Sequence, residues 1–201
     1  MDQGLNWELA RALNGLAGHF PIFDALAAIV AEDLIFLILA IAVVWWFLPT
    51  DGDVGKRAAL AAFVAVVFGQ AINLAIGHVI FVPRPFVAHQ VHLLVNAAHD
   101  SSFPSDHATA AFSVATTALL WRMPGRRLLL LGAVLIAFGR VYVGAHYPAD
   151  VVVGAALGAI WATLALKLDG WLSHLYDLPI GLYGIAMGLV RRALKGRSSG
   201  A

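Results

Sequence analysis

The sequence contains no cysteine, and only 12% of its 201 residues carry a charge. The first absence excludes disulfide bonds and thiolate chemistry, although it does not indicate a cellular compartment. The second argues against a soluble domain, in which about 25% of the residues are usually charged. Because the formal net charge is only +1, there is also no basic field of the kind that attracts nucleic acid.

The first residues do not resemble a cleaved signal peptide, and nothing in the composition indicates a second domain. No basic segment precedes an apolar core at the start of the chain, so we expect the first helices to be retained. No fixed-period repeat or low-complexity linker is present, and 201 residues fit one domain. We therefore expect residues 1–201 to form a single unit, with a core at about 55–167 and a disordered tail at 195–201.

What the sequence does contain is a series of long apolar runs. Hydrophobic residues make up 61% of the chain, and the mean hydropathy is +0.82. A membrane-spanning helix needs about 20 mostly apolar residues, and clear runs lie at 34–48, 58–80, 108–121, 128–143 and 151–166. We predict an all-α, polytopic membrane bundle of five or six transmembrane helices, in which the last four runs form the catalytic core.

The two ends of the chain are less clear than these five runs. Residues 6–16 have an amphipathic pattern, whereas residues 20–31 are apolar but short and contain Asp24. The second segment is either a sixth, tilted span or an interfacial helix, so we group residues 1–31 as candidate interfacial helices. Residues 180–194 are ambiguous in the same way.

The distribution of basic residues predicts an orientation in the membrane. If each run crosses once, ten of the 13 Lys and Arg residues fall on one side, which the positive-inside rule makes cytoplasmic. Arg84 and Arg140 then lie on the outer, periplasmic side of an inner membrane. The ten are Lys56, Arg57, Arg122, Arg126, Arg127, Lys167, Arg191, Arg192, Lys195 and Arg197.

Three short segments place polar groups at the ends of apolar runs. They lie at 83–86, 103–107 and 139–150, and the order of the crossings puts all three at the same face. A charged residue inside a span costs about 2.5–3.5 kcal/mol on insertion scales. A scaffold gives no reason for such residues to cluster, so we interpret the three segments as a functional site.

Three residues of these segments are candidate catalytic groups. His146 and Asp150 are four residues apart at the start of a predicted helix, so they share one of its faces. A carboxylate there can accept the proton of one ring nitrogen and leave the other nitrogen free to attack. His107 lies in the first turn of another predicted helix, where it could protonate a leaving oxygen.

Arg84, Ser105 and Arg140 are candidate ligands of a phosphate group. The arginines can clamp its oxygens with paired N–H groups. Ser105 follows Pro104 and is expected to cap a helix whose free N–H groups form a cradle for an anion. With a histidine nucleophile, these parts suffice for phosphoryl transfer through a phosphohistidine.

The three segments resemble the signature of the type-2 phosphatidic acid phosphatase family. The match consists of Arg84-Pro85, Pro104-Ser105-Asp106-His107, and Arg140, His146 and Asp150 at the family spacing. The resemblance implies a helical membrane phosphatase that needs no metal and no cofactor. It also implies the roles of nucleophile for His146, partner for Asp150, acid for His107, and phosphate binding for Arg84, Ser105 and Arg140.

The chain departs from that signature at three positions. The family lysine would fall at Gly77, and the neighbouring His78 is a weak substitute. Asp106 replaces a common glycine in the phosphate-binding segment; the helix dipole favours a carboxylate there, but phosphate would repel it, so we expect its side chain to point away. Gly139 replaces a common serine, which removes one potential hydrogen bond.

The sequences of residues 83–86 and 103–109 resemble the corresponding segments of bacterial undecaprenyl-diphosphate phosphatases linked to bacitracin resistance. This similarity favours a polyprenyl diphosphate as substrate, with undecaprenyl diphosphate converted to the monophosphate. Phosphatidic acid, phosphatidylglycerol phosphate or phosphotransfer to another lipid would use the same chemistry. An anion transporter or channel would leave the spacing of His146 and Asp150 unexplained.

Other polar or small residues have simpler interpretations. His89, His92 and His99 match no familiar zinc spacing, so we expect no metal site. Gln70 and Asn73 are expected to form hydrogen bonds between helices. Gly154 and Gly158 indicate close helix packing, either within the chain or in a homodimer. The expected partners are therefore a lipid phosphate, the bilayer and, as an open alternative, a second copy.

Overall fold

The structure is a computed structural model that describes residues 4–50 and 52–198. These residues form nine helices and no strand, so the prediction of an all-α fold is confirmed. The helices are α1 (Gly4–Asn14), α2 (Pro21–Glu32), α3 (Leu34–Trp45), α4 (Val54–Val79), α5 (Pro85–Ala88), α6 (Asp106–Leu120), α7 (Arg126–Tyr142), α8 (Pro148–Lys167) and α9 (Asp169–Ser198).

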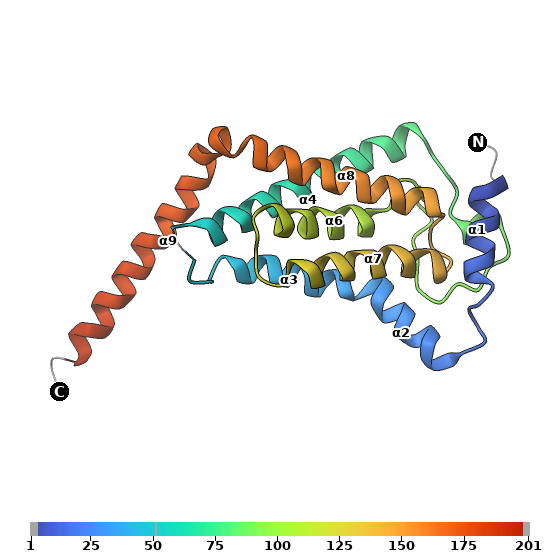
Figure 1. Ribbon diagram of the computed structural model, residues 1–201, viewed down its shortest axis with the longest axis horizontal. Coiled ribbons are helices and arrows are strands. Elements are labelled where there is room, and N and C mark those ends of the chain that lie inside the picture. The colour runs from blue at the N-terminus through green and yellow to red at the C-terminus, as the bar shows by residue number, and fades with distance from the viewer. Residues whose placement is uncertain (1–3, 51, 199–201) are drawn as a thin grey trace.

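Helix α6 lies at the centre of the bundle, between the α4–α8 pair and the α3–α7 pair (Figure 1). Four helices border the polar segments, and α6 packs against the other three, α4, α7 and α8, to form the core of the fold. The hydroxyl groups of Thr109, Ser113 and Thr117 on α6 each donate to the backbone carbonyl four residues earlier. These bonds satisfy polar groups that have no access to water.

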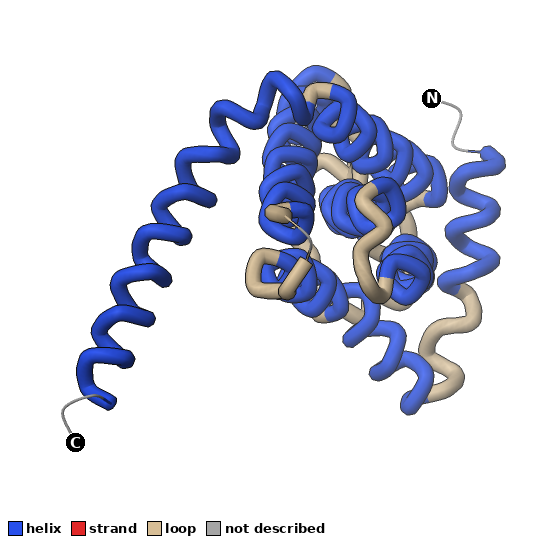
Figure 2. The backbone as a smooth tube through the Cα atoms, turned by 60° about the vertical axis from the view of Figure 1, so that its left-hand side comes forward, coloured by secondary structure: helices blue, strands red, loops and turns tan. Residues whose placement is uncertain are grey.

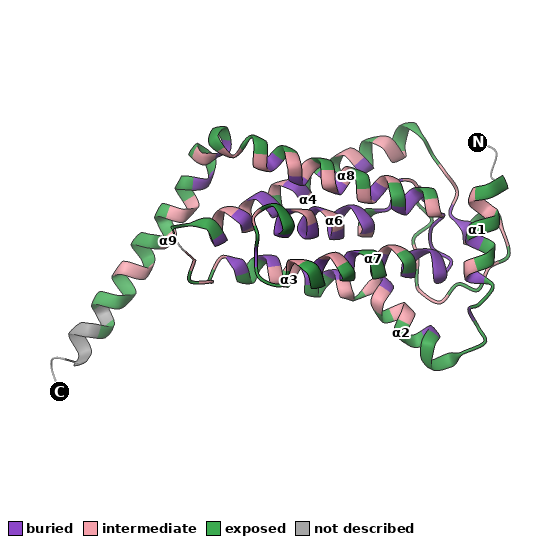
Figure 3. Ribbon diagram, in the orientation of Figure 1, coloured by how far each residue is buried: buried purple, intermediate pink, exposed green. Residues whose placement is uncertain are grey.

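Many of the buried residues are small, and many large apolar residues are exposed. Figure 3 shows how buried and exposed residues are distributed along the helices. Phe36, Phe63 and Leu131 are each more than half exposed. A soluble protein would bury such side chains, whereas lipid tails solvate them, and small residues let helix backbones approach closely. The buried alanines include Ala58, Ala61, Ala62, Ala65, Ala108, Ala111, Ala115, Ala118, Ala133 and Ala162.

Not every helix of the bundle meets a strict test for a membrane span. Within the described ranges, α4 and α8 are long and apolar enough by themselves, and α2 and α3 qualify as one bent span with a break of 42°. Helices α6 and α7 have only 15 and 17 residues. The count of five or six crossings therefore stays a prediction, while two or three candidate spans are established.

Gly154 and Gly158 are used for packing within the chain. A Cβ atom at Gly154 would lie 2.6 Å from the backbone oxygen of Ser105, and one at Gly158 would lie 2.4 Å from that of Thr109. The backbones of α6 and α8 therefore touch along this stripe. The close contact brings the start of α8, with Asp150, beside the loop that precedes α6.

We expect Gly158→Ala to lower the free energy of unfolding by about 1–3 kcal/mol, because the added methyl group must push α6 and α8 apart. The matched control is Gly170→Ala on α9, where a Cβ atom would meet nothing within 4 Å. Thermal unfolding of both variants in detergent measures the difference. Equal midpoints would show that the α6–α8 contact is not as tight as the structure has it.

The two ends of the chain lie at opposite ends of the bundle. Helix α1 crosses the end where the polar segments meet, and α9 projects away from the other end (Figures 1 and 2). We expected residues 195–201 to be disordered, but α9 continues to Ser198. Residues 199–201, at the end of that expected tail, and Asp51, in the predicted turn at 49–53, lie outside the described residues.

Candidate active site

The three polar segments meet at the end of the bundle that α1 covers (Figure 1). The turns that carry Lys56, Arg57, Arg126 and Arg127 lie at the opposite end, at the starts of α4 and α7. The crossing order predicted this separation. It follows that the site residues and the main basic turns face opposite ends of the bundle.

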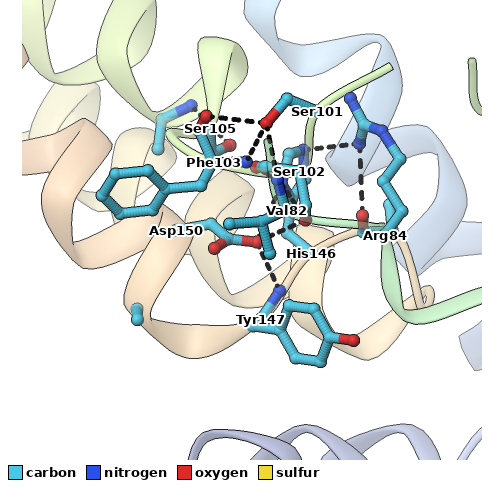
Figure 4. Close-up of polar contacts among 12 residues, drawn as sticks. Val82, Arg84, Ser101, Ser102, Phe103, Ser105, His146, Tyr147 and Asp150 are labelled. Carbon is cyan, nitrogen blue, oxygen red and sulfur yellow. Dashed lines mark hydrogen bonds and ion pairs between the residues drawn. The ribbon is translucent and has the colours of Figure 1, made fainter. Parts of the chain in front are cut away.

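His146 is held by a short loop between α7 and α8. Gly144 turns the chain with a positive φ of 80°, a conformation that glycine adopts without strain. The backbone N–H groups of Ala145 and His146 then both donate to the carbonyl of Arg140, at 3.2 and 3.1 Å. This loop points the imidazole into the site, where only 2% of the residue is exposed (Figure 4).

The nearest acceptor for Nδ1 of His146 is the backbone carbonyl of Ser102, at 2.8 Å. The Oδ2 atom of Asp150 is 3.4 Å away, which is long for an N–H···O hydrogen bond. The sequence led us to expect a direct bond to Asp150, so this detail is corrected. The carbonyl of Ser102 requires a proton on Nδ1 and thereby leaves the lone pair on Nε2.

Asp150 acts on His146 partly through Ser102. Its Oδ2 atom accepts hydrogen bonds from Oγ of Ser102 at 2.5 Å and from the backbone N–H of Tyr147 at 2.8 Å (Figure 4). The carboxylate is 2% exposed and lies in the first turn of α8. It therefore fixes the segment that binds Nδ1 and places a negative charge beside the ring.

Arg84 occupies the other side of the imidazole. Its Nη1 atom lies 3.0 Å from Nε2 of His146 and 3.2 Å from the carbonyl oxygen of Ala145. Its Nε atom donates to Asp100 at 2.8 Å. The guanidinium is thus fixed next to the nitrogen that carries the lone pair, as expected for a residue that would bind a group under attack.

Arg140 has a partner that sequence reasoning missed. Its side chain is buried and forms an ion pair and hydrogen bond with Glu32 at the end of α2. Its Nε atom is buried and has no hydrogen-bond partner within the described chain. A buried guanidinium with a free donor is suited to an anion, since an unused donor is costly.

The start of α6 matches most of what the sequence predicted. Ser105 is buried and caps the helix, its Oγ atom accepting from the N–H of Ala108 at 3.4 Å. His107 is half-buried in the first turn of the same helix. Ser105 and His107 therefore both lie at the start of α6, where the sequence predicted them.

Asp106 and the polar residues of α4 hold the start of α6 in place. Nδ2 of Asn73 donates to Oδ1 of Asp106 and to Oγ1 of Thr109, both at 2.9 Å. Nε2 of Gln70 donates to the backbone carbonyl of Asp106 at 3.0 Å. The prediction of hydrogen bonds between helices is confirmed, and the carboxylate of Asp106 is directed at α4.

The loop histidines make ring contacts. His89 stacks on Trp7 of α1 with ring centroids 3.8 Å apart, and His99 meets the ring of Phe86 edge-on. Among the described residues, no group of three His, Cys, Asp or Glu side chains could hold a metal ion. For a phosphate group, the site provides arginine side chains, the start of α6 and histidine side chains.

The Nε2 lone pair of His146 needs an unprotonated ring, and its surroundings favour one. Burial lowers the pKa of His146 most strongly, and the charges of Arg140 and Arg84 lower it further. Asp150 opposes them, because a nearby carboxylate favours the protonated ring. The ring is therefore neutral at a pH where a free histidine would be partly charged.

Three residues of this site were not predicted: Ser102, Glu32 and Asp100. The pair of serines at 101–102 stands just before the second motif, and its position was the one available signal for Ser102. No local pattern marks Glu32, since its partner Arg140 is 108 residues away. Asp100 lies in the same loop as His89, His92 and His99, for which the sequence predicted no metal site.

This chain is similar to known proteins in both sequence and fold. The model of the PAP2 superfamily matches residues 58–173. Undecaprenyl-diphosphatase BcrC of Bacillus subtilis (strain 168) is 34% identical over 181 residues, which cover 89% of this chain and 92% of that protein. The crystal structure of Aquifex aeolicus LpxE has a TM-score of 0.64 at 28% identity and covers 81% of this chain and 95% of that one.

A second solved structure supports the fold alone. The first transmembrane PAP2 type phosphatidylglycerolphosphate phosphatase from Bacillus subtilis also has a TM-score of 0.64, at 22% identity. It covers 85% of this chain and 87% of that one. The helical arrangement described above is therefore that of transmembrane PAP2 proteins.

Proposed function

This chain belongs to the PAP2 superfamily, and from that premise we propose that it hydrolyses a polyprenyl diphosphate, undecaprenyl diphosphate in the first instance, to the monophosphate. It is an integral membrane phosphatase. The substrate class is supported by 34% identity to BcrC along 92% of that protein. The observation that carries the mechanism is His146, with Nδ1 2.8 Å from the carbonyl oxygen of Ser102 and Nε2 3.0 Å from Nη1 of Arg84.

In the first step, the lone pair on Nε2 of His146 attacks the terminal phosphorus atom. The bond from this phosphorus to the bridging oxygen breaks, and its electron pair leaves with the lipid monophosphate, which His107 protonates. Arg84 exchanges its contact with Nε2 for a phosphate oxygen. Arg140 and the start of α6 at Ser105 stabilise the charge on the other oxygens.

In the second step, water attacks the phosphohistidine. His107, which has lost its proton, now accepts one from the water, and the bond between Nε2 and phosphorus breaks to return its electron pair to the ring. Inorganic phosphate leaves, and His146 regains its starting state. While Nε2 carries the phosphoryl group the ring is cationic, and the Ser102 carbonyl and the Asp150 carboxylate stabilise that cation.

A cavity beside the catalytic carboxylate is a suitable place for the isoprenoid chain. It has a volume of about 760 Å³, and Asp150 is one of the residues that line it. Most of its lining is apolar and comes from α1, from residues 80–83 and from the start of α8, with Leu5, Leu9, Phe81 and Val152 among the side chains. An apolar wall next to a phosphate site fits a lipid with a charged head.

We place the site at the periplasmic face of the inner membrane. The basic turns at the starts of α4 and α7 lie at the other end of the bundle, and basic residues favour the cytoplasmic side. The diphosphate would then be cleaved outside the cell membrane. Labelling of single cysteines placed at Arg127 and at His99 with a membrane-impermeant reagent tests this orientation, and reaction at position 127 alone would reverse it.

The function is tested by phosphate release from the purified protein in detergent with a chelator present. Undecaprenyl diphosphate and phosphatidic acid are offered separately. Release that survives chelation supports the histidine mechanism, and faster release from undecaprenyl diphosphate supports the substrate class. Faster release from phosphatidic acid would move the substrate to glycerophospholipids, and no release from either by folded protein would contradict the proposal.

We expect the acid limb of kcat/KM to lie below pH 6.5. His146 attacks as a neutral imidazole, and its lowered pKa keeps the ring neutral as the pH falls through about 6.5, the value of an exposed histidine. Activity is lost only when the pH falls through that lowered pKa. A pH profile with undecaprenyl diphosphate measures the limb, and a midpoint at or above 6.5 would show that burial does not control this ring.

A further inference from the structure

We propose that Glu32 sets the affinity of the site for phosphate by sharing the guanidinium of Arg140 with the bound anion. This role rests on the proposed function, because it assigns a phosphate oxygen to Arg140. Glu32 lies at the end of α2 and belongs to none of the three polar segments. It would act as a positioning residue that never touches the substrate itself.

In the contact between the two side chains, the arginine is buried and the glutamate is partly exposed. The side chain of Arg140 is 4% exposed and that of Glu32 is 33% exposed, and Oε1 of Glu32 accepts a hydrogen bond from Nη1. Removing an arginine from water is costly unless a carboxylate compensates its charge. Glu32 therefore makes it possible for Arg140 to sit inside the site, while Nε keeps an unused donor for another acceptor.

Glu32 is brought there by close packing of α2 against α7. A Cβ atom at Gly139 would lie 3.3 Å from Cβ and 3.4 Å from Cα of Ala31, so a larger residue at 139 would push α2 away. Farther along the same pair, the hydroxyl of Tyr142 donates to Asp24 at 2.6 Å. The sequence suggested that glycine at 139 only removes a hydrogen bond. In the structure, this glycine lets α2 approach α7 closely enough for Glu32 to pair with Arg140.

The chain bends directly after this residue. Helix α2 ends at Glu32 and α3 begins at Leu34, with an angle of 42° between them. Asp33 lies at the bend and forms no ion pair or side-chain cap within the described residues. Of these two adjacent carboxylates, only that of Glu32 is paired with Arg140 within the described structure.

A carboxylate and a phosphate dianion on one guanidinium weaken each other's attraction to it. The carboxylate neutralises part of the charge that would otherwise hold the phosphate, and the two anions also repel. A phosphatase must release inorganic phosphate after every turnover, so a site with two buried arginines needs a limit on its affinity. Glu32 supplies that limit while keeping Arg140 in position.

The test is Glu32→Gln in the full-length protein in detergent, with inorganic phosphate titrated by calorimetry and used as an inhibitor of hydrolysis. The amide keeps the size of the side chain and removes its charge. We expect both the Kd and the inhibition constant for phosphate to fall about tenfold, which corresponds to about 1.4 kcal/mol. Asp33→Asn is the matched control, and its constants should equal those of the wild type.

A double-mutant cycle separates this role from a general structural one. On an Arg140→Gln background, Glu32→Gln should no longer change the phosphate affinity, because the shared cation is gone. Unchanged or weaker phosphate binding in Glu32→Gln, with Asp33→Asn unaffected, would overturn the proposal. If Glu32→Gln does not fold, Glu32→Asp decides, since its shorter carboxylate loosens the pair; a fall in Kd supports the proposal and any other result contradicts it.

The calorimetric arm also separates this proposal from the proposed function. A wild-type protein that binds phosphate but releases none from undecaprenyl diphosphate would contradict the substrate assignment and leave the affinity comparison valid. A wild-type protein that hydrolyses the lipid, with no change in phosphate affinity on Glu32→Gln, would contradict only the role of Glu32. Each result therefore refers to one proposal.

Discussion

Replacing His146 by alanine is expected to lower kcat for undecaprenyl diphosphate by on the order of 10⁵-fold, the scale seen when a catalytic nucleophile is removed. The imidazole is buried between the Ser102 carbonyl and Arg84, and its Nε2 lone pair is the nucleophile of the proposed mechanism. The loss of kcat is measured as phosphate release with undecaprenyl diphosphate as the substrate. Quenching at alkaline pH, with substrate labelled in the terminal phosphate, should trap an acid-labile phosphoprotein in the wild type and none in the variant.

The matched control is His174→Ala. His174 is exposed on α9, at the end of the bundle opposite the site. Its kcat should equal that of the wild type, and both variants should give monodisperse protein. An alanine variant at 146 that keeps more than about a hundredth of the activity, or that still forms the labelled intermediate, would assign the nucleophile to another residue.

Asp150→Asn is expected to lower kcat by about 10²- to 10⁴-fold, in line with the loss of a carboxylate that orients a catalytic histidine. The amide is isosteric, but it has no negative charge to stabilise the imidazolium that carries the phosphoryl group. Its oxygen can still accept from Ser102 or Tyr147, so we expect a smaller effect on stability than on kcat. Steady-state kinetics and a thermal unfolding curve separate the two.

Comparison with Ser102→Ala distinguishes the charge of Asp150 from its role in positioning Ser102. The alanine variant keeps the backbone carbonyl that accepts from Nδ1 and loses only the hydroxyl that bonds to Asp150. We therefore expect less than about a tenfold loss in kcat, near the value of one hydrogen bond. Equal losses in the two variants would mean that Asp150 acts mainly through the hydroxyl.

A control for the general effect of removing a carboxylate is Asp169→Asn. Asp169 pairs with Arg57 at 2.8 Å, at the far end of the bundle from the site. Removing the charge of Asp169 should lower the unfolding midpoint and leave kcat nearly unchanged. A large fall in kcat at this position would show that activity in detergent reports the integrity of the bundle rather than the chemistry of the site.

Much of the fold and of the site was predictable, because both leave local marks in the chain. The apolar runs at 58–80 and 151–166 correspond to α4 and α8, since the bilayer fixes how long an apolar helix must be. The Ser105 cap was predictable because a helix start needs a side-chain acceptor. The positions of His107, His146 and Asp150 followed from charges at the ends of apolar runs.

Other parts were not predictable, because they depend on contacts between distant segments. Ser102 is 44 residues from His146 and 48 from Asp150, and its decisive group toward His146 is a backbone carbonyl that every residue has. Glu32 is 108 residues from Arg140, and nothing near it in sequence marks it as part of a site. The direct bond between His146 and Asp150 was expected from helical spacing, but His146 lies in the loop before α8.

The sequence by itself therefore determined which chemistry the chain carries and which end of the bundle holds it, because residue type, spacing and apolar length act locally along the chain. Only the tertiary structure decided which atom fixes the His146 tautomer and which carboxylate neutralises Arg140. Those choices depend on how closely α6 approaches α8 and α7 approaches α2. Glycines at 139, 154 and 158 set these distances, and differences of an ångström decide whether a polar group is a hydrogen-bond partner or a neighbour.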